Sequence, residues 1–208
     1  MLKDADPLHK VSIIPRGPMG GATFALPEKD RLYYSRKFCL AELQICYGGR
    51  IAESMFCDDI TSGARSDIKQ ATMLARGMVM EWGMGEQLGP VNYAPDNSGD
   101  PYLYGGPDFS QKTSEMIDNE VRKLIDTAYN SALELLKANR DKAEALAKAL
   151  LKYETLDAED VKIILAGGHL EKPTISDLLA KEENKSDTPK DADQPDNDSD
   201  TDPFGQLK

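Results

Sequence analysis

The sequence predicts a mainly helical protein with a small β-hairpin near its N-terminus and a disordered acidic tail at its C-terminus. Apolar residues recur at helical spacing through most of residues 35–166. Two short runs rich in β-branched and apolar residues, 10–15 and 22–26, flank a glycine turn. Beyond about Ala180 the chain is Asp, Lys, Pro, Ser and Asn without an apolar period. We therefore expect a folded domain over residues 1–179 and a disordered tail over 180–208.

The charge of the chain excludes one class of partner. The 208 residues carry a formal net charge of -11, whereas proteins that bind nucleic acid present basic surfaces. From Lys181 onward nine acidic residues stand against four basic ones, so the folded part is only mildly acidic. No apolar run approaches the ~20 residues that span a bilayer.

The first elements are the two strands and a long helix. Pro15 closes the first strand, and Pro27 ends the second. Ser35 is a suitable N-cap for a helix that runs to about Ser54. Its expected inward positions are Phe38, Leu43, Cys46, Tyr47 and Ile51. The pair Gly48-Gly49 inside it costs about 1 kcal/mol per residue relative to alanine, so we expect close helix packing there.

The three cysteines form no metal or redox motif. Cys39 and Cys46 are two turns apart on one helical face, which favours buried apolar positions. With Cys57 the number is odd, and no signal peptide precedes them, so we expect a reducing compartment.

Four further helices and one loop complete the domain. A second helix is expected from near Ser66, with Gly83 and Gly85 at its end. Residues 89–108 are rich in Pro, Gly, Asn and Tyr and predict an irregular loop. Helices are expected over about 110–138 and 140–153, and Asp157 caps a last one over 158–166. The first three of these helices have expected inward residues, in order Ile68, Ala71, Ala75, Met78, Val79 and Trp82, then Ile117, Val121, Leu124, Ala128, Ala132 and Leu135, then Leu146, Ala149, Leu150 and Tyr153.

The residues alone give no complete active site. Asp67 lies in the first turn of the second helix, where the helix dipole favours a carboxylate for purely structural reasons. Zinc needs three or four converging ligands, and a zinc hydrolase usually carries H-E-x-x-H. The chain has only His9 and His169, neither in such a motif. We interpret both as structural or surface residues.

Longer motifs change this interpretation. The opening segment 4–17, Asp-Ala-Asp-Pro-Leu-His-Lys-Val-Ser-Ile-Ile-Pro-Arg-Gly, resembles the FtsH family of ATP-dependent zinc metalloproteases. Gly48-Gly49-Arg50-Ile51-Ala52-Glu53, Thr61-Ser62-Gly63-Ala64-x-x-Asp67-Ile68 and Trp82-Gly83-Met84 resemble it too, as do Asn139-Arg140 and Tyr153-Glu154-Thr155-Leu156. The resemblance covers about residues 4–168 in unbroken order.

The resemblance implies a specific chemistry. Family members are membrane-anchored hexameric rings in which an ATPase module feeds unfolded or membrane proteins to a helical zinc peptidase. Two histidines of H-E-x-x-H and a downstream aspartate hold the zinc, and Asp67 matches that aspartate. The zinc and the motif glutamate activate water. Substrate lies along a sheet edge near the metal, which makes Gly21, Ala22, Thr23, Phe24 and Ala25 the candidate substrate-binding strand. The resemblance places such a protein in the cytoplasm or at the cytoplasmic face of the inner membrane.

The sequence departs from the family pattern at one point. The H-E-x-x-H helix, the ATPase module and the membrane anchor are missing, and Met1 falls just after the place of the metal helix. We therefore expect the C-terminal part of an FtsH-type peptidase domain, unable to cut peptides alone because two zinc ligands and the base are missing. Such a chain should expose an apolar patch. The alternatives are a non-enzymatic helical module that joins or regulates a full-length protease ring, and an unrelated helical bundle.

Overall fold

The computed structural model describes residues 2–17, 20–27, 31–57, 59–94 and 109–174. The chain forms two compact units, Met1–Leu170 and Glu171–Lys208, and every element below belongs to the first. The predicted boundary at 179/180 and the predicted disordered tail lie outside the described residues, as does most of the predicted loop 89–108. Of that loop, residues 89–94 are described and contain neither helix nor strand.

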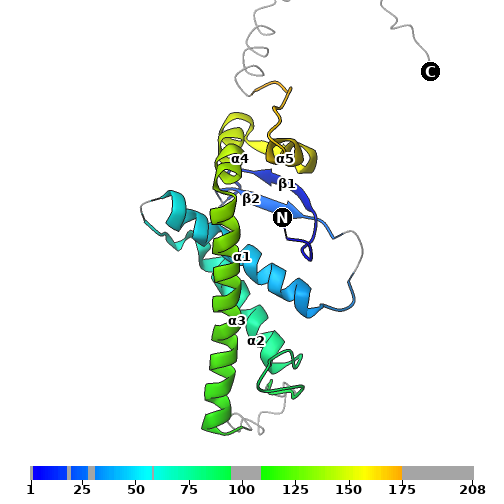
Figure 1. Cartoon of the computed structure of the whole chain (residues 1–208), viewed down its shortest axis with the longest axis vertical. Helices are drawn as coiled ribbons and strands as arrows, with labels where there is room; N and C mark the ends of the chain where they lie inside the picture. Colours follow the sequence, from blue (N-terminus) through cyan, green and yellow to red (C-terminus); the bar gives the residue numbers. More distant parts are fainter. Residues whose placement is uncertain (1, 18–19, 28–30, 58, 95–108, 175–208) are drawn as a thin grey trace, which may run out of the picture. The chain divides into compact units, whose positions relative to one another are not determined.

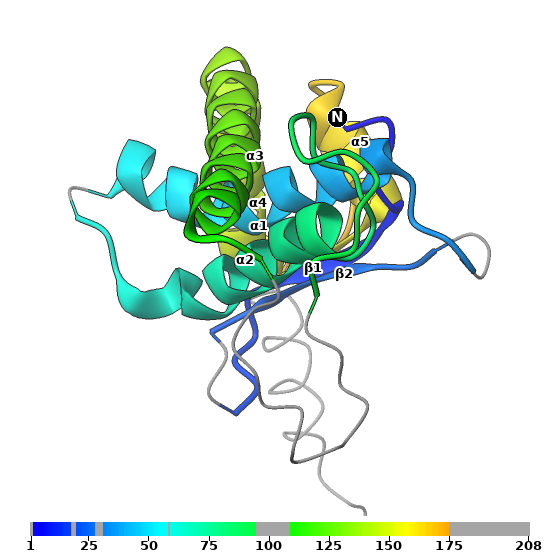
Figure 2. The ribbon, with the colours of Figure 1, turned by 90° about the horizontal axis from the view of Figure 1, so that it is seen from below.

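The helical core consists of three helices (Figure 1). They are α1 (Arg36–Phe56), α2 (Arg65–Met80) and α3 (Gln111–Ala138). As predicted, Ser35 caps α1, since its side chain accepts a hydrogen bond from the Phe38 backbone N–H. Seen from below, α1 and α2 run side by side and α3 crosses both (Figure 2). The main cluster of buried residues lies where the three helices meet.

A three-stranded sheet forms the second part of the domain. The predicted hairpin is confirmed: β1 (Leu8–Ser12) pairs antiparallel with β2 (Ala22–Ala25). A third strand, β3 (Thr155–Asp157), pairs with the other side of β1 and was not predicted. The order β2-β1-β3 therefore leaves β2 at one edge of the sheet.

Two short helices complete the sheet region. These are α4 (Arg140–Tyr153) and α5 (Ala158–Leu165). Asp157 caps α5 with a full capping box. The Asp157 side chain accepts a hydrogen bond from the Asp160 backbone N–H, and the Asp160 side chain accepts one from the Asp157 backbone N–H. Together with β3 they enclose a smaller apolar cluster around Leu156. None of the helices that the structure describes has the length and apolar character needed to cross a membrane.

Most predicted core positions are buried, and two expectations are wrong. Gly48 and Gly49 do not face a close neighbour, because a Cβ at either would meet no atom within 4 Å. Trp82 lies beyond the end of α2 and is 41% exposed. The inward residues predicted for α4, which are Leu146, Ala149, Leu150 and Tyr153, are partly buried and pack against the cluster around Leu156.

Candidate functional site

The segment that leads into α2 is held by the end of α1. Glu53 accepts two hydrogen bonds from Thr61, from its hydroxyl at 2.5 Å and from its backbone N–H at 3.2 Å. Arg50 donates to the Thr61 carbonyl at 3.0 Å and pairs with Glu53 at 3.3 Å. These hydrogen bonds from Thr61, with the charge of Arg50, hold the pKa of Glu53 below its ordinary value. The start of α2 is therefore fixed against α1.

The short helical turn before α2 completes this anchor. Thr61 caps the 3₁₀ turn η1 (Ser62–Ala64), and its hydroxyl accepts from the Gly63 N–H at 3.1 Å. Ala64 is buried, so this turn is packed against the rest of the domain. In the sequence, Arg50 and Glu53 stand out only as part of the motif Gly48-Gly49-Arg50-Ile51-Ala52-Glu53. Their spacing of three on one helix, a geometry suited to an ion pair, is the signal that could have identified them as an anchor.

Asp67 lies in the first turn of α2, as predicted, with an exposed side chain. Burial raises the pKa of the neighbouring Cys46 thiol to about 11, and the negative charges of Asp67 and Glu42 add to that rise. The negative charge of Asp67 therefore influences Cys46 in the middle of α1, where α1 and α2 meet.

The described residues do not make a zinc site by themselves. No group of three or more His, Cys, Asp and Glu side chains within them is arranged to hold a metal ion. His9 lies on β1 and His169 follows α5, and both are exposed. A zinc site needs at least three converging protein ligands, so Asp67 fits one position of such a site and no more.

The candidate substrate strand lies at the sheet edge. Residues 22–25 form β2, which pairs with β1 on one side only in the described sheet. Gly21 enters this strand where a Cβ would lie 2.7 Å from the Ser12 carbonyl oxygen, so a larger residue would force the two strands apart. The Lys10 ammonium lies 5.0 Å from the Phe24 ring centroid. An edge strand offers free backbone N–H and C=O groups to a further strand.

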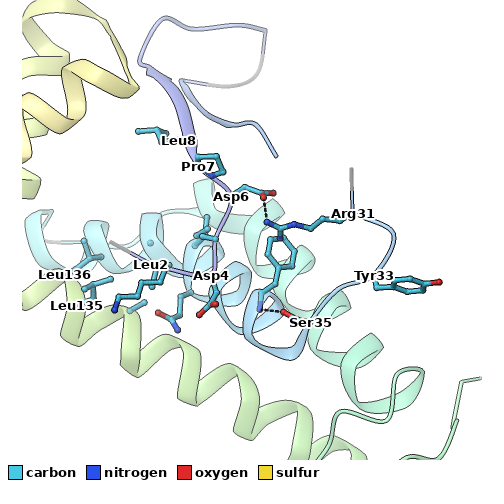
Figure 3. A pocket seen from close by; sticks show the side chains of 17 residues that line it. Leu2, Asp4, Asp6, Pro7, Leu8, Arg31, Tyr33, Ser35, Leu135 and Leu136 are labelled. Atoms are coloured by element: carbon cyan, nitrogen blue, oxygen red, sulfur yellow. Dashed lines mark hydrogen bonds and ion pairs between the residues drawn. The ribbon is translucent and has the colours of Figure 1, made fainter. Parts of the chain in front are cut away.

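A wide groove of about 1130 Å³ borders α1 (Figure 3). Its walls are the N-terminal segment Leu2–Leu8, one face of α1 and the last turns of α3. Leu2 of the N-terminal segment and Leu135 and Leu136 of α3 all line this groove (Figure 3). Ile45, which also lines it, is 48% exposed, and Gly48 beside it presents open space. In the described part of the domain, α1 therefore has room beside Ile45 and Gly48 for a further group.

A second exposed set of apolar residues precedes α1. Leu32 and Tyr33 are 86% and 87% exposed. Both lie in the segment that joins the sheet to α1. The apolar patch that the sequence analysis expected thus has a counterpart in these residues and in the groove.

Comparison with known proteins identifies the family. The family model described as "Peptidase family M41" matches residues 1–164. The chain is 45% identical over 179 residues to the ATP-dependent zinc metalloprotease FtsH 2 of Methylacidiphilum infernorum, covering 83% of this chain and 28% of that protein. It is 46% identical over 172 residues to the ATP-dependent zinc metalloprotease FtsH 4 of Sorangium cellulosum, covering 81% of this chain and 26% of that protein. It is 42% identical over 167 residues to the ATP-dependent zinc metalloprotease FtsH of Chlamydia trachomatis, covering 79% of this chain and 18% of that protein.

These relatives are much longer than the chain, which spans between 18% and 28% of their length. The matched region includes the strand pair, α1, α2 and all of α3 and α4. The resemblance read from the motifs is therefore confirmed over most of the sequence. The chain belongs to peptidase family M41, the FtsH-type ATP-dependent zinc metalloproteases.

Proposed function

We propose that this chain is the C-terminal part of the proteolytic domain of an ATP-dependent zinc metalloendopeptidase, in which Asp67 is one zinc ligand. The observation that carries the proposal is an exposed carboxylate in the first turn of α2, on a segment anchored by Arg50 and Glu53, in a chain 45% identical to such a protease. The other two ligands and the catalytic base would be the histidines and glutamate of an H-E-x-x-H helix that this sequence does not contain.

The remaining roles of the chain follow from its exposed surfaces. When bound, zinc would polarise the peptide carbonyl and activate water. The chain's own contribution would be to hold Asp67 in place and to bind an extended substrate along β2, residues 22–25 with Gly21. Alone, the chain would neither bind zinc stoichiometrically nor cut peptides, since it lacks two ligands and the base.

The wider roles are proposed from the relatives. The complete protein would assemble as a hexameric ring at the cytoplasmic face of the inner membrane and degrade unfolded or membrane proteins. ATP would be used by a module outside this chain. The open space on α1 at Ile45 and Gly48 supports the proposal that the complete protein is larger, since a further part of the peptidase domain could pack there.

Zinc content tests the proposal directly. The purified chain should contain far less than one zinc per molecule by plasma mass spectrometry and should not degrade casein. In a longer form that carries an H-E-x-x-H helix before residue 1, Asp67→Asn should lower zinc retention against a chelator by about tenfold or more. Asp59→Asn, an exposed aspartate before the same helix, should leave retention unchanged. Stoichiometric zinc with casein cleavage by the chain alone would contradict the proposal.

The second candidate is a non-enzymatic module that joins or regulates a complete protease ring. The same exposed groove favours it, because an apolar face of this size can bind another chain. Co-purification of the chain with an intact M41 protease, lost in Ile45→Asp, would support this role. A monomer that an intact protease never retains would count against it.

A further inference from the structure

Arg31 lies in the segment that joins β2 to α1, and its side chain reaches the residues before β1. Its Nη2 atom donates to Asp6 Oδ1 at 2.6 Å. Figure 3 shows this contact, with Asp6 followed by Pro7 and by Leu8, the first residue of β1. The ion pair therefore joins the chain after β2 to the chain before β1, although the two residues are 25 positions apart in the sequence.

Arg31 also contacts the first turn of α1. The carbon of its guanidinium group lies 3.9 Å from the centroid of the Phe38 ring, which is a cation–π contact. Phe38 packs against the main apolar cluster, and its backbone N–H donates to the capping Ser35. The guanidinium therefore rests on a fixed support. Because it is planar, it can stack on a ring and donate to a carboxylate at the same time, which a lysine ammonium does less well.

The ion pair is partly shielded from water. The Asp6 side chain is 17% exposed and that of Arg31 is 34% exposed. Ion pairs on an open surface contribute little because water and salt screen them, and partial burial reduces that screening. The next two residues, Leu32 and Tyr33, are 86% and 87% exposed. Arg31 thus ties this part of the segment to the domain, whereas its two neighbours are open to solvent.

A second carboxylate lies within reach of the Arg31 charge. Glu42, one helical turn after Phe38, lines the same groove as Asp6 and Arg31. Burial is the main cause that raises the pKa of Glu42; the negative charge of Asp6 raises it further, and the positive charge of Arg31 lowers it. Without Arg31, Asp6 and Glu42 would repel each other where the N-terminal segment meets α1.

These contacts lie just beyond the end of the candidate substrate strand β2. At the start of β2, Gly21 approaches the Ser12 carbonyl oxygen so closely that a Cβ would lie 2.7 Å from it. At its end, the Leu26 N–H donates to the Pro7 carbonyl at 3.1 Å, one residue from Asp6. The outer edge of β2 is unpaired in the described sheet. The position of β2 therefore depends on β1 and on the contacts at its two ends.

The helix α1 connects this end of β2 with the candidate zinc ligand. Phe38 supports Arg31 near the start of α1, and Arg50 and Glu53 near its other end hold the segment before α2. A helix is a stiff spacer with a rise of about 1.5 Å per residue. The chain that leaves β2 and the start of α2, which carries Asp67, are therefore both held on one rigid element.

We propose that Arg31 is a positioning residue, which through its contacts with Asp6 and Phe38 fixes the end of β2 on α1. It thereby sets where a substrate that lies along β2 meets the helix α2. This inference rests on the proposed function, in which β2 binds the substrate. Arg31 acts through β2 and takes no part in the reaction itself.

Amide hydrogen exchange of the chain, followed by NMR, tests the structural step. In Arg31→Gln the Leu26 N–H should exchange about tenfold faster than in the parent, because the contact that fixes the end of β2 is lost. The Ile13 N–H, which donates to the Glu154 carbonyl on the β3 side of the sheet, should exchange at an unchanged rate. Arg122→Gln removes an exposed arginine of α3 and should leave both rates unchanged.

Paired variants show whether the two charges act together. Asp6→Asn should by itself speed the exchange of Leu26, and adding Arg31→Gln to it should change the rate less than Arg31→Gln does in the parent. Arg31→Lys keeps the charge without the planar stack and should restore only part of the parent rate. Leu32→Ala, at the exposed neighbour, should have no effect. Effects of Asp6→Asn and Arg31→Gln that simply multiply would contradict the inference.

Steady-state kinetics test the role in substrate positioning. In a longer form that carries an H-E-x-x-H helix before residue 1, Arg31→Gln should raise KM for a long unstructured peptide about tenfold, with kcat changed by less than about twofold. The reason is that β2 binds the substrate, whereas Asp67 stays anchored through Arg50 and Glu53. A general loss of folded protein would lower kcat and leave KM unchanged. Arg122→Gln should leave both constants unchanged.

Several outcomes would overturn the inference. These are an unchanged exchange rate of Leu26 in Arg31→Gln, equally faster exchange of Ile13, and a loss of activity confined to kcat. Absence of cleavage by the parent longer form would contradict the proposed function, and with it the role in substrate positioning. The exchange rates would still decide whether Arg31 fixes β2, because they need neither metal nor substrate.

Discussion

At the scale of single residues, the three cysteines have different environments inside and beyond α1. Cys39 is fully buried and Cys46 nearly so, as the helical spacing of the two predicted, whereas Cys57 beyond the helix is exposed. Burial raises the pKa of both helix cysteines, and that of Cys46 reaches about 11. A thiol with a raised pKa is rarely in the reactive thiolate form.

This difference predicts the thiol chemistry of the chain. At pH 8 an alkylating reagent should modify Cys57 quickly and leave Cys39 and Cys46 largely unmodified, as measured by mass spectrometry of the intact protein. All three should react in denaturant. Cys57→Ser should remove the fast phase, and fast modification of a second cysteine in the native chain would contradict the described packing.

The anchor at Glu53 predicts a pH effect on stability. Because the pKa of Glu53 is lowered from 4.5 in the folded chain, its ionised form stabilises the fold fully above pH 4.5. This stabilisation is lost as the pH falls through the folded pKa. In Glu53→Gln the melting temperature should therefore fall less steeply between pH 5 and pH 3 than in the parent, a pH range of about two units around the Glu value.

A charge-matched control separates the anchor from a general effect of charge. Glu81→Gln removes an exposed carboxylate at the end of α2, outside the contacts of Thr61. It should leave the slope of melting temperature against pH close to that of the parent. An equal change of slope in both variants would show that Thr61 and Arg50 do not perturb Glu53.

At the scale of elements, the helices were predictable because each carries an apolar stripe, and three of them also begin at a capping residue. Ser35, Ser110 and Asp157 cap α1, α3 and α5 through side-chain hydrogen bonds. β3 was not predictable in the same way, because three residues are too few to show an alternating pattern. It forms because Thr155–Asp157 lie beside β1 in the fold, where the Ser12 and Thr155 hydroxyls meet at 2.8 Å.

Gly48 and Gly49 within α1, and Gly83 after α2, give predictions of opposite sign. In this chain Gly48→Ala and Gly49→Ala should each raise the free energy of unfolding by up to about 1 kcal/mol, because the new methyl meets nothing and helix propensity improves. Gly83→Ala should lower it, since φ there is +59° and a Cβ would lie 2.7 Å from Pro90 Cα. Urea unfolding measures all three; destabilisation by Gly48→Ala would mean that something packs on that face.

At the scale of the whole domain, the fold rests on two apolar clusters. The larger joins α1, α2 and α3, and the smaller joins α4, β3 and α5 around Leu156, which is fully buried. The strand β1 connects the smaller cluster to the N-terminal hairpin. Residues far apart in the sequence are thus needed together for either part to be stable.

This arrangement predicts the cost of a single core change. Leu156→Ala should lower the free energy of unfolding by about 2–5 kcal/mol, because it leaves a cavity among α4, β3 and α5. Leu151→Ala, five residues earlier but 77% exposed, should change it by less than about 0.5 kcal/mol. Urea unfolding of both variants gives the comparison, and a small effect at Leu156 would contradict the second cluster.

The sequence by itself determined the helices, the hairpin, the buried faces and the family, because apolar periodicity, caps and ordered motifs are properties of neighbouring residues. It also placed Asp67 in a helix N-terminal turn. Only the tertiary structure decided what surrounds these elements: the open space at Gly48 and Gly49, the exposed Trp82, the anchor of Arg50 and Glu53 on Thr61, and the contacts of Arg31 with Asp6 and Phe38. These depend on which helix faces meet and which remain uncovered, and the spacing of residues along one element does not specify that.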